Sequence, residues 1–180
     1  MKRSADDPWY VSRQDYLDGE RSAPTKSEWV DGVVYAMAGA SKRHVTVVSR
    51  LMELLAGVGR KKGCLVGSND LLVATATANY YPDIVGTCRP SDDPYVEHDP
   101  CFIVEVLSPS TTRVDRVEKR DAFLALASME TYWIVDPESK VVEAWERTAD
   151  GWTGLHHSAA EPMTVACLGA TVRVVDIVGP

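Results

Sequence analysis

The sequence predicts a mixed α/β (α+β) fold in which a mixed central sheet is flanked by helices. The chain has 180 residues, of which 45% are apolar and 25% charged, so it can bury a core without disulfides or a structural metal. Two segments carry apolar side chains at helical spacing, and several short segments are rich in β-branched and aromatic residues. Their order is a hairpin, a helix, three or four strands, a second helix and further strands. A sheet covered by helices is the simplest packing of that order.

The N-terminal segment is predicted to form a tail, a short helix and a hairpin. Residues 1–8 are expected to be a disordered tail, and Ser12 can cap a short helix that continues to Leu17 and ends at Gly19. In 28–37, two β-prone runs are joined by Asp-Gly, a dipeptide typical of tight hairpin turns. The sequence therefore predicts an N-terminal hairpin added to the central sheet.

A long amphipathic helix is predicted over residues 42–56. Ser41 is a candidate N-cap, and apolar side chains recur at 3-4 spacing along the segment. Gly57 stands where such a helix would end.

The rest of the chain is predicted to be mostly strand, with one more helix. Within 101–107 only Glu105 is charged, as in a central strand covered on both faces. Thr111 or Thr112 is a candidate cap for a helix through about Ala127. The other expected strands are 64–66, 71–74, 80–86, 132–135, 141–145, 152–155, 163–165 and 171–178, with a polar loop at 88–99.

Composition and motifs exclude several classes of protein. There are 19 basic and 26 acidic residues, a net charge of −7, so a nucleic-acid surface would have to be a local patch. No apolar run approaches a membrane span and no signal peptide begins the chain, so we expect a cytoplasmic protein that does not bind membranes. The sequence has no Walker loop, no G-x-G-x-x-G and no G-x-S-x-G. Its four cysteines form no C-x-x-C pair and are expected to be reduced, mostly buried thiols.

Two acidic residues on neighbouring predicted strands are the strongest candidates for chemistry. Glu105 would be buried by its own strand, so it must be neutral, paired or bound to a metal ion. A salt bridge to a basic residue on the following helix is the structural alternative. Asp83 precedes another apolar run, where it could also be a simple strand cap. If the two carboxylates face each other, a hard divalent cation such as Mg²⁺ would offset their repulsion.

Basic residues on the second predicted helix could complete this site. Lys119 lies in the first half of that helix, which packs back near the carboxyl end of the preceding strand, and it could polarise a phosphate. Arg113, Arg116 and Arg120 recur at 3-4 spacing, which suits contact with a phosphate backbone. Acidic residues alternate with them, so a solvated face with pairs such as Asp115–Lys119 explains the pattern equally well.

Two further residues are weaker candidates for the same site. Glu28 could be an additional acid beside the metal, although an exposed strand-end carboxylate is the simpler interpretation. His44 could contact the metal site or the substrate, although a capping or surface histidine is the simpler interpretation of its position near a helix start.

As a set, these motifs resemble the Uma family of restriction-endonuclease-like proteins, a branch of the PD-(D/E)XK nuclease superfamily. The likeness extends from about residue 10 to Val178. It depends on the order of several motifs, each of which is unspecific alone. They are the segments 28–32, 81–85, 103–111 and 131–137, together with His44, Asp115 and Lys119.

The resemblance implies an αβββαβ core with a divalent-metal site. Pro82 and Asp83 would be the "PD" of the superfamily motif, and Glu105 its "(D/E)". The lysine of the superfamily's (D/E)-x-K motif would fall on Leu107, which has no basic group. Its role would therefore pass to Lys119 on the helix.

The sequence therefore predicts one nuclease-like domain over residues 1–180 that hydrolyses phosphodiester bonds of DNA with Mg²⁺ or Mn²⁺. Asp83, Glu105 and the backbone carbonyl of Val106 would hold the metal ion, and Lys119 would orient water and stabilise the transition state. Glu28 and His44 would adjust the site or the substrate, and the three arginines would contact DNA.

Two other interpretations stay open at this point. One is a non-catalytic nucleic-acid-binding or assembly module that keeps the nuclease scaffold. The other is a structural Glu105–Lys119 salt bridge in a protein whose function lies elsewhere. The resemblance also makes a homodimer plausible, with the aromatic residues of 132–152 as its contact.

Overall fold

The computed structural model describes residues 6–108, 114–158 and 160–179. Its helical segments are α1 (Arg13–Glu20), α2 (Lys42–Lys61), the π-helix η1 (Val114–Lys119), α3 (Arg120–Leu124) and α4 (Val174–Val178). The strands up to the second helical region are β1 (Ser27–Val30), β2 (Val33–Ala36), β3 (Leu65–Gly67), β4 (Leu72–Ala74), β5 (Ala78–Tyr80), β6 (Ile84–Thr87), β7 (Val96–Glu97) and β8 (Phe102–Val106). After it come β9 (Thr131–Asp136), β10 (Val141–Thr148), β11 (Gly151–Ser158), β12 (Pro162–Val165) and β13 (Ala170–Arg173).

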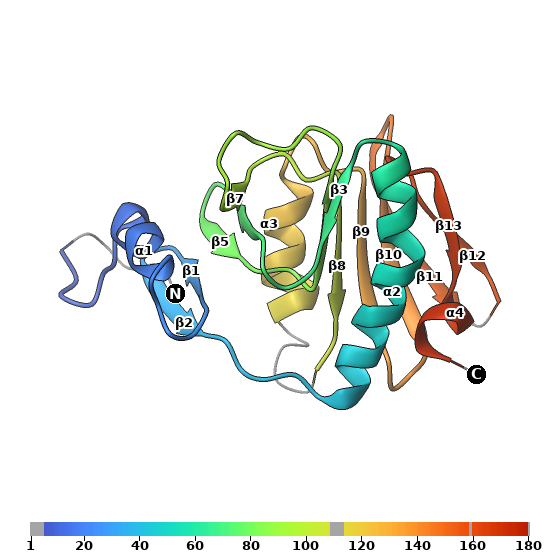
Figure 1. Ribbon diagram of the computed structural model, residues 1–180, viewed down its shortest axis with the longest axis horizontal. Helices are drawn as coiled ribbons and strands as arrows, with labels where there is room; N and C mark the ends of the chain where they lie inside the picture. Colours follow the sequence, from blue (N-terminus) through green and yellow to red (C-terminus); the bar gives the residue numbers. More distant parts are fainter. Residues whose placement is uncertain (1–5, 109–113, 159, 180) are drawn as a thin grey trace.

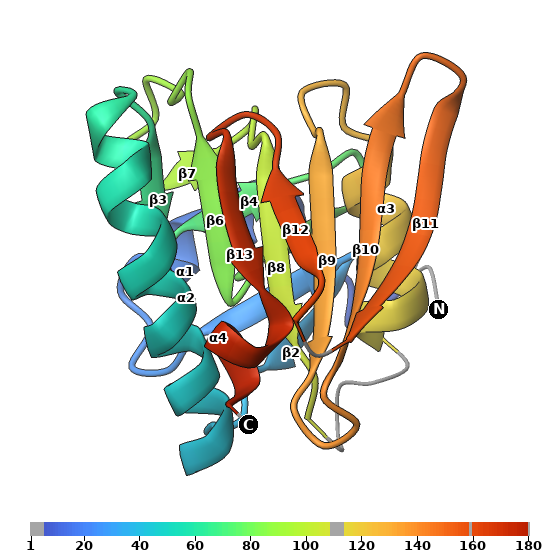
Figure 2. The ribbon, with the colours of Figure 1, turned by 90° about the vertical axis from the view of Figure 1, so that its right-hand side faces the viewer.

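The strands form two main sheets and a small C-terminal ribbon. The larger sheet has the order β11-β10-β9-β8-β6-β3, and only its β8–β9 pair is parallel. The smaller sheet has the order β2-β1-β5-β4-β7, and β12 pairs with β13 separately. The predicted αβββαβ core is present within this arrangement (Figure 2). In chain order it consists of α2, β3, β6, β8, the η1–α3 segment and β9, with strands β4, β5 and β7 of the smaller sheet inserted between its strands.

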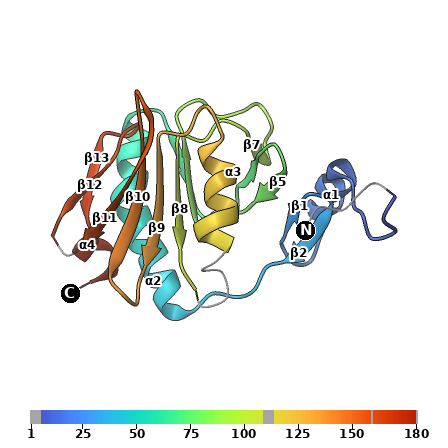
Figure 3. The same ribbon diagram turned by 180° about the vertical axis from the view of Figure 1, so that it is seen from behind.

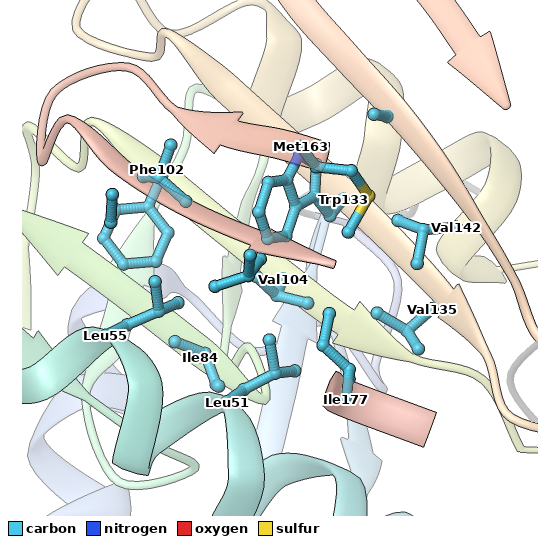
Figure 4. Close-up of a cluster of buried hydrophobic side chains, with 14 of the residues drawn as sticks. Leu51, Leu55, Ile84, Phe102, Val104, Trp133, Val135, Val142, Met163 and Ile177 are labelled. Carbon is cyan, nitrogen blue, oxygen red and sulfur yellow. The ribbon is translucent and has the colours of Figure 1, made fainter. Parts of the chain in front are cut away.

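The larger sheet is covered on both faces, as the apolar 101–107 run predicts. One face packs against α2, the β12–β13 ribbon and α4, and its core includes Leu51, Val104 and Trp133 (Figure 4). The other face lies against α3 and part of the smaller sheet, with Ile103 and Phe123 at the centre of a second cluster. Alternate residues of β8 therefore enter different cores, as the period of a strand requires.

The N-terminal hairpin lies at the opposite end of the molecule from the C-terminal ribbon (Figures 1 and 3). Asp31 and Gly32 form its turn with φ of 45° and 87°, the left-handed values that a tight hairpin turn needs. The hairpin joins the rest of the protein because β1 pairs with β5, Trp29 opposite Asn79. The hairpin predicted at 28–37 is thus present.

Local capping fixes where the first two helices begin. The hydroxyl of Ser12 accepts the N–H of Asp15, and the hydroxyl of Ser41 accepts the N–H of His44. Both predicted N-caps are therefore correct. None of the helices in the described part of the chain combines the length and hydropathy that a membrane-spanning helix requires.

Both glycine stops predicted for these helices are wrong. α1 continues past Gly19 to Glu20, and α2 continues through Gly57 to Lys61. Beyond Gly57, Val58 still packs against the core and Gly59 lies buried against β3, and the gain from that packing exceeds the propensity cost of one glycine.

Three other predicted segments differ in the structure. The run 80–86 is not one strand: β5 and β6 belong to different sheets, and Pro82, which lacks an N–H, lies between them. The second helix starts as a π-helix and its α-helical part ends at Leu124, while its predicted caps at 111–112 lie outside the described residues. The last predicted strand, 171–178, ends at Arg173 and is followed by helix α4.

The prediction of reduced cysteines is also wrong. The structure pairs Cys64 with Cys88 and Cys101 with Cys167 in disulfides, and it contains no free cysteine. Sequence spacing gave no sign of this pairing, because each bond joins residues that only the fold brings together.

Candidate active site

Asp83 and Glu105 lie on the same face of the larger sheet. β6 and β8 are antiparallel, with Ile84 opposite Val104, and continuing this register by one residue places Asp83 opposite Glu105. Side chains of directly opposed residues project from the same face. The contact is close, because the backbone N–H of Val106 donates to Asp83 Oδ2 at 2.7 Å. The fold thus brings together the two acids that the sequence placed on neighbouring strands.

Lys119 reaches this pair from the last residue of η1. Its Nζ lies 3.3 Å from Glu105 Oε1 and 3.0 Å from Glu28 Oε1. The Lys119 side chain is 8% exposed and that of Glu105 is 3% exposed, so the contact is shielded from water. Such a π-helical turn is rare and is often found at functional sites. The predicted return of the helix to the end of β8 is therefore observed.

Glu28 enters the site from β1 of the smaller sheet. Besides Lys119, its Oε1 accepts the backbone N–H of Tyr81 at 3.1 Å. The Lys119 ammonium also lies 5.5 Å from the centre of the Tyr80 ring. Burial and the nearby charge of Glu28 raise the pKa of the Tyr80 hydroxyl, so this phenol stays neutral beside the ammonium.

His44 contacts the other acid. It occupies the first turn of α2, and its Nε2 lies 3.0 Å from Asp83 Oδ1. The two side chains are 12% and 13% exposed. Asp83 is therefore held from two directions, by the Val106 N–H at one oxygen and by the His44 ring at the other.

These side chains line a cleft of about 310 Å³. The predicted residues in its wall are Glu28, His44, Asp83, Glu105, Val106 and Lys119. The prediction missed other lining residues, which are Tyr35, Met37, Asn69, Tyr81, Ser108 and the small residues at 36 and 38–40. Tyr81 could have been found, because it directly precedes the Pro-Asp motif. Burial and the Glu20 carboxylate raise its pKa to about 12, so its hydroxyl stays neutral at physiological pH.

The donor groups of the cleft suit a hard divalent cation. Three carboxylates, those of Glu28, Asp83 and Glu105, face one ammonium and one imidazole, which leaves an excess of negative charge in a largely buried space. Carboxylate and backbone carbonyl oxygens are the ligands that Mg²⁺ and Mn²⁺ prefer. Asp83, Glu105 and Val106 therefore fit the metal-binding role predicted for them.

Of the predicted DNA-contacting arginines, the structure describes Arg116 and Arg120, and neither lines the cleft. Arg116 Nε lies 2.7 Å from Glu143 Oε1, and its Nη2 lies 3.8 Å from Asp136 Oδ2. Arg120 pairs with Asp121 and stacks over the ring of Trp145. Arg113 lies outside the described residues. A role of these side chains in DNA contact stays a prediction.

The sequence matches a known family and is similar to known proteins. Residues 13–172 match the family Uma2, described as "Putative restriction endonuclease". The Synechocystis sp. protein slr1290 is 31% identical over 169 residues, which cover 91% of this chain and 89% of that protein. A second Synechocystis sp. protein, sll1609, is 27% identical over 147 residues, or 78% of this chain and 82% of that protein.

A solved structure shares the fold. It is the crystal structure of "a putative nuclease belonging to DUF820" from Anabaena variabilis, which matches with a TM-score of 0.76 at 14% identity. The match covers 93% of this chain and 97% of that one. The restriction-endonuclease-like fold predicted from the sequence is thereby confirmed.

Proposed function

This chain belongs to the Uma2 family of restriction-endonuclease-like proteins, and on that basis we propose that it is an endonuclease that hydrolyses DNA with Mg²⁺ or Mn²⁺. One observation carries the proposal. Two carboxylates on one face of the sheet, Asp83 and Glu105, meet a buried lysine from a separate helix in a single cleft. Paired acids with an adjacent cationic donor are suited to phosphodiester hydrolysis, because charge develops on the phosphate oxygens in the transition state.

Asp83, Glu105 and the backbone carbonyl of Val106 would hold the metal ion. When bound, it supplies Lewis acidity that activates water and stabilises charge on the phosphate. The Val106 N–H and the His44 ring keep the Asp83 carboxylate in one orientation, so its remaining lone pairs face the cleft in a fixed direction.

Lys119 would supply the positive charge that meets the scissile phosphate. Glu28 and Glu105 hold its ammonium in place before the substrate binds. Less side-chain conformational entropy is therefore lost when the phosphate binds. Glu28 would act by positioning Lys119 rather than by touching the substrate. Its own orientation is set by the N–H of Tyr81.

The experiment is a nicking assay on supercoiled plasmid DNA with the full chain. Wild type should convert plasmid to nicked and linear forms with Mg²⁺ or Mn²⁺, and EDTA should stop the reaction. Asp83→Asn and Glu105→Gln keep the shape of each side chain but remove its charge, so each should lower the rate by at least about 100-fold. Glu53→Gln, an exposed carboxylate of α2, is the matched control and should cleave like wild type.

Two results would contradict the proposal. One is equal metal-dependent nicking by wild type and both site variants, which would point to a contaminating nuclease. The other is no nicking together with no heat when the folded wild type is titrated with Mg²⁺ or Mn²⁺. That second result would favour the non-catalytic nucleic-acid-binding or assembly module.

The predicted homodimer and cytoplasmic location also belong to this proposal. Tyr132 and Trp133, in the aromatic segment first expected to form the dimer contact, are fully buried within one chain. A dimer contact in that segment would therefore have to use its two partly exposed aromatic residues, Trp145 and Trp152, and light scattering of the purified chain measures whether a dimer forms.

A further inference from the structure

The four cysteines of the chain converge at one end of the larger sheet. Cys64 directly precedes β3, Cys88 directly follows β6, and Cys101 directly precedes β8. Because β6 runs antiparallel to both β3 and β8, these three positions lie at the same end of three adjacent strands. Cys167 reaches them from the turn between β12 and β13.

The sulfur atoms of Cys88, Cys101 and Cys167 form one cluster, to which Cys64 is joined by its disulfide with Cys88. Cys88 Sγ is bonded to Cys64 Sγ and lies 3.9 Å from Cys101 Sγ. The sulfurs of Cys88, Cys101 and Cys167 all lie within 4.8 Å of one another. Among the described residues, no other set of three His, Cys, Asp or Glu side chains brings its ligand atoms so close.

We propose that this cysteine cluster, when reduced, is a structural binding site for one Zn²⁺ ion. Four thiolates at about 2.3 Å from a tetrahedral Zn²⁺ lie about 3.8 Å apart, which is close to the separation of Cys88 and Cys101. Four thiolate ligands select a soft or borderline metal such as Zn²⁺ over Mg²⁺. The site can form only where both disulfides are reduced, as they would be in the cytoplasm proposed for this chain.

Converting the two disulfides into a zinc site requires only a dithiol reductant and the metal ion. Two dithiol molecules give four electrons and four protons to the two disulfides, and each dithiol leaves as a cyclic disulfide. The four thiols then lose four protons as four Zn–S bonds form. Reduction is therefore the step that makes the site available.

The surroundings of the cluster suit a closed structural site. Cys64 and Cys101 are buried, and Cys88 and Cys167 are half-buried, all packed against the main hydrophobic core. Four thiolates around Zn²⁺ leave a net charge of about −2. Lys62 is a candidate to offset part of that charge, because it precedes Cys64 by two residues. Its Nζ also lies 2.9 Å from the position that a Cβ would take on Gly169, two residues after Cys167.

The cluster is separate from the acidic cleft. Asp83 precedes the start of β6 and Cys88 follows its end, so the two sites lie at opposite ends of the same strands. Their ligands also differ in kind, oxygen at one and sulfur at the other. A metal bound at each site can therefore be distinguished by spectroscopy.

The test uses Co²⁺ as the probe on the full chain reduced with a dithiol and then freed of reductant without air. We expect one Co²⁺ per chain, with an intense near-ultraviolet thiolate-to-Co²⁺ charge-transfer band and the visible bands of tetrahedral Co²⁺. Zn²⁺ should displace Co²⁺ and abolish these bands. Native mass spectrometry should show, relative to the reduced chain at the same charge state, a mass gain of one Zn²⁺ less two protons.

Variants and redox state supply the controls. Asp83→Asn should keep the charge-transfer band at full intensity, because its oxygen ligand belongs to the other site. Cys88→Ser and Cys101→Ser should each lose most of it, and the oxidised wild type should show none. If the reduced wild type, folded by circular dichroism, gives no band and retains no Zn²⁺ after desalting, the proposal is wrong. It is equally wrong if both serine variants keep the full band.

Discussion

A single buried ammonium balances two buried carboxylates in the candidate site. Lys119 lies within hydrogen-bonding or ion-pairing distance of Glu28 and Glu105, and none of the three side chains is more than 14% exposed. Such an arrangement costs desolvation energy that the attraction only partly offsets. Removing one member leaves the others buried without their partner charge.

Lys119→Met should therefore destabilise the fold by about 3–5 kcal/mol, measured by urea unfolding followed by circular dichroism. If the carboxylates bind a divalent cation, millimolar Mg²⁺ should recover part of that loss in the variant, because ligand binding to the folded state stabilises it. Arg120→Met, at the next residue, removes an ion pair with the more exposed Asp121 and should cost less than about 1 kcal/mol. Equal losses in the two variants would refute the assignment of Lys119 to a buried network.

Asp136 should make stability depend on pH. Burial by itself would raise its pKa, but hydrogen bonds from Ser139 and Glu138 and the charge of Arg116 together hold the pKa below its usual value. A lowered pKa stabilises the fold above the unfolded-state value of about 3.9, and that stabilisation disappears as the pH falls through the folded-state value.

Asp136→Asn should thus cost about 0.5–1.5 kcal/mol at neutral pH, where the carboxylate accepts both turn N–H groups. The difference in Tm between variant and wild type should narrow as the pH is lowered past 4. Glu138→Gln, on an exposed side chain of the same turn, provides the comparison and should show little change at any pH. A constant Asp136→Asn difference down to low pH would contradict the argument.

The charged residues of the site could be predicted from the sequence for a physical reason. A carboxylate within an apolar strand is too costly to bury without a compensating partner, so the sequence alone identifies Glu105 as a candidate. Asp83 stood out for its place beside a second apolar run. Tyr35 and Asn69 carried no such signal, because their place in the cleft depends on loop paths that sequence pattern does not determine.

Two glycines of α2 differ in whether the packing of the helix leaves room for a side chain. A Cβ on Gly59 would lie 2.5 Å from Val66 Cγ2, so the absence of a side chain lets α2 approach β3 closely. A Cβ on Gly57 would meet no atom within 4 Å. Only Gly59 is thus required by the fold.

These two positions form a matched pair of substitutions in one helix. Gly59→Ala should destabilise the fold by about 1–3 kcal/mol through overpacking. Gly57→Ala should stabilise it by about 0.5–1 kcal/mol, because alanine has the higher helix propensity. Chemical denaturation of both variants measures the difference, and two shifts of the same sign would contradict it.

The elements that were predicted correctly are those with strong local determinants. The hairpin follows from Asp31-Gly32, and the start of α2 follows from its cap at Ser41. The break between β5 and β6 was missed, because which sheet a strand joins depends on distant partners. Helix α4 was missed because its five residues, Val174–Val178, are mostly β-branched, and their packing on the core overrides that propensity.

For the whole molecule, charge limits how DNA could be held. The net charge is −7, and Arg116 and Arg120 already pair with acidic side chains. The proposed substrate would therefore be held through few phosphate contacts, each of which contributes about −0.9 to the slope of log K against log salt concentration.

We expect that slope to be shallower than about −4 for duplex DNA, measured by fluorescence anisotropy with Ca²⁺ in place of Mg²⁺. Arg116→Gln should change it little, since that guanidinium lies 2.7 Å from Glu143. A slope near −10, or one reduced by Arg116→Gln, would show that the arginines leave their acidic partners and bind the phosphate backbone.

The path of the chain also decides when the cleft can exist. Its charged residues come from positions 28 to 119 of the chain. They meet only after β1 has paired with β5 and the η1–α3 segment, which connects β8 to its parallel neighbour β9, has packed on the sheet. Contacts between such distant segments form late, because loop-closure entropy opposes them. An incompletely synthesised or partly folded chain would therefore lack the assembled cleft, so the proposed nuclease would become active only once these distant segments have met.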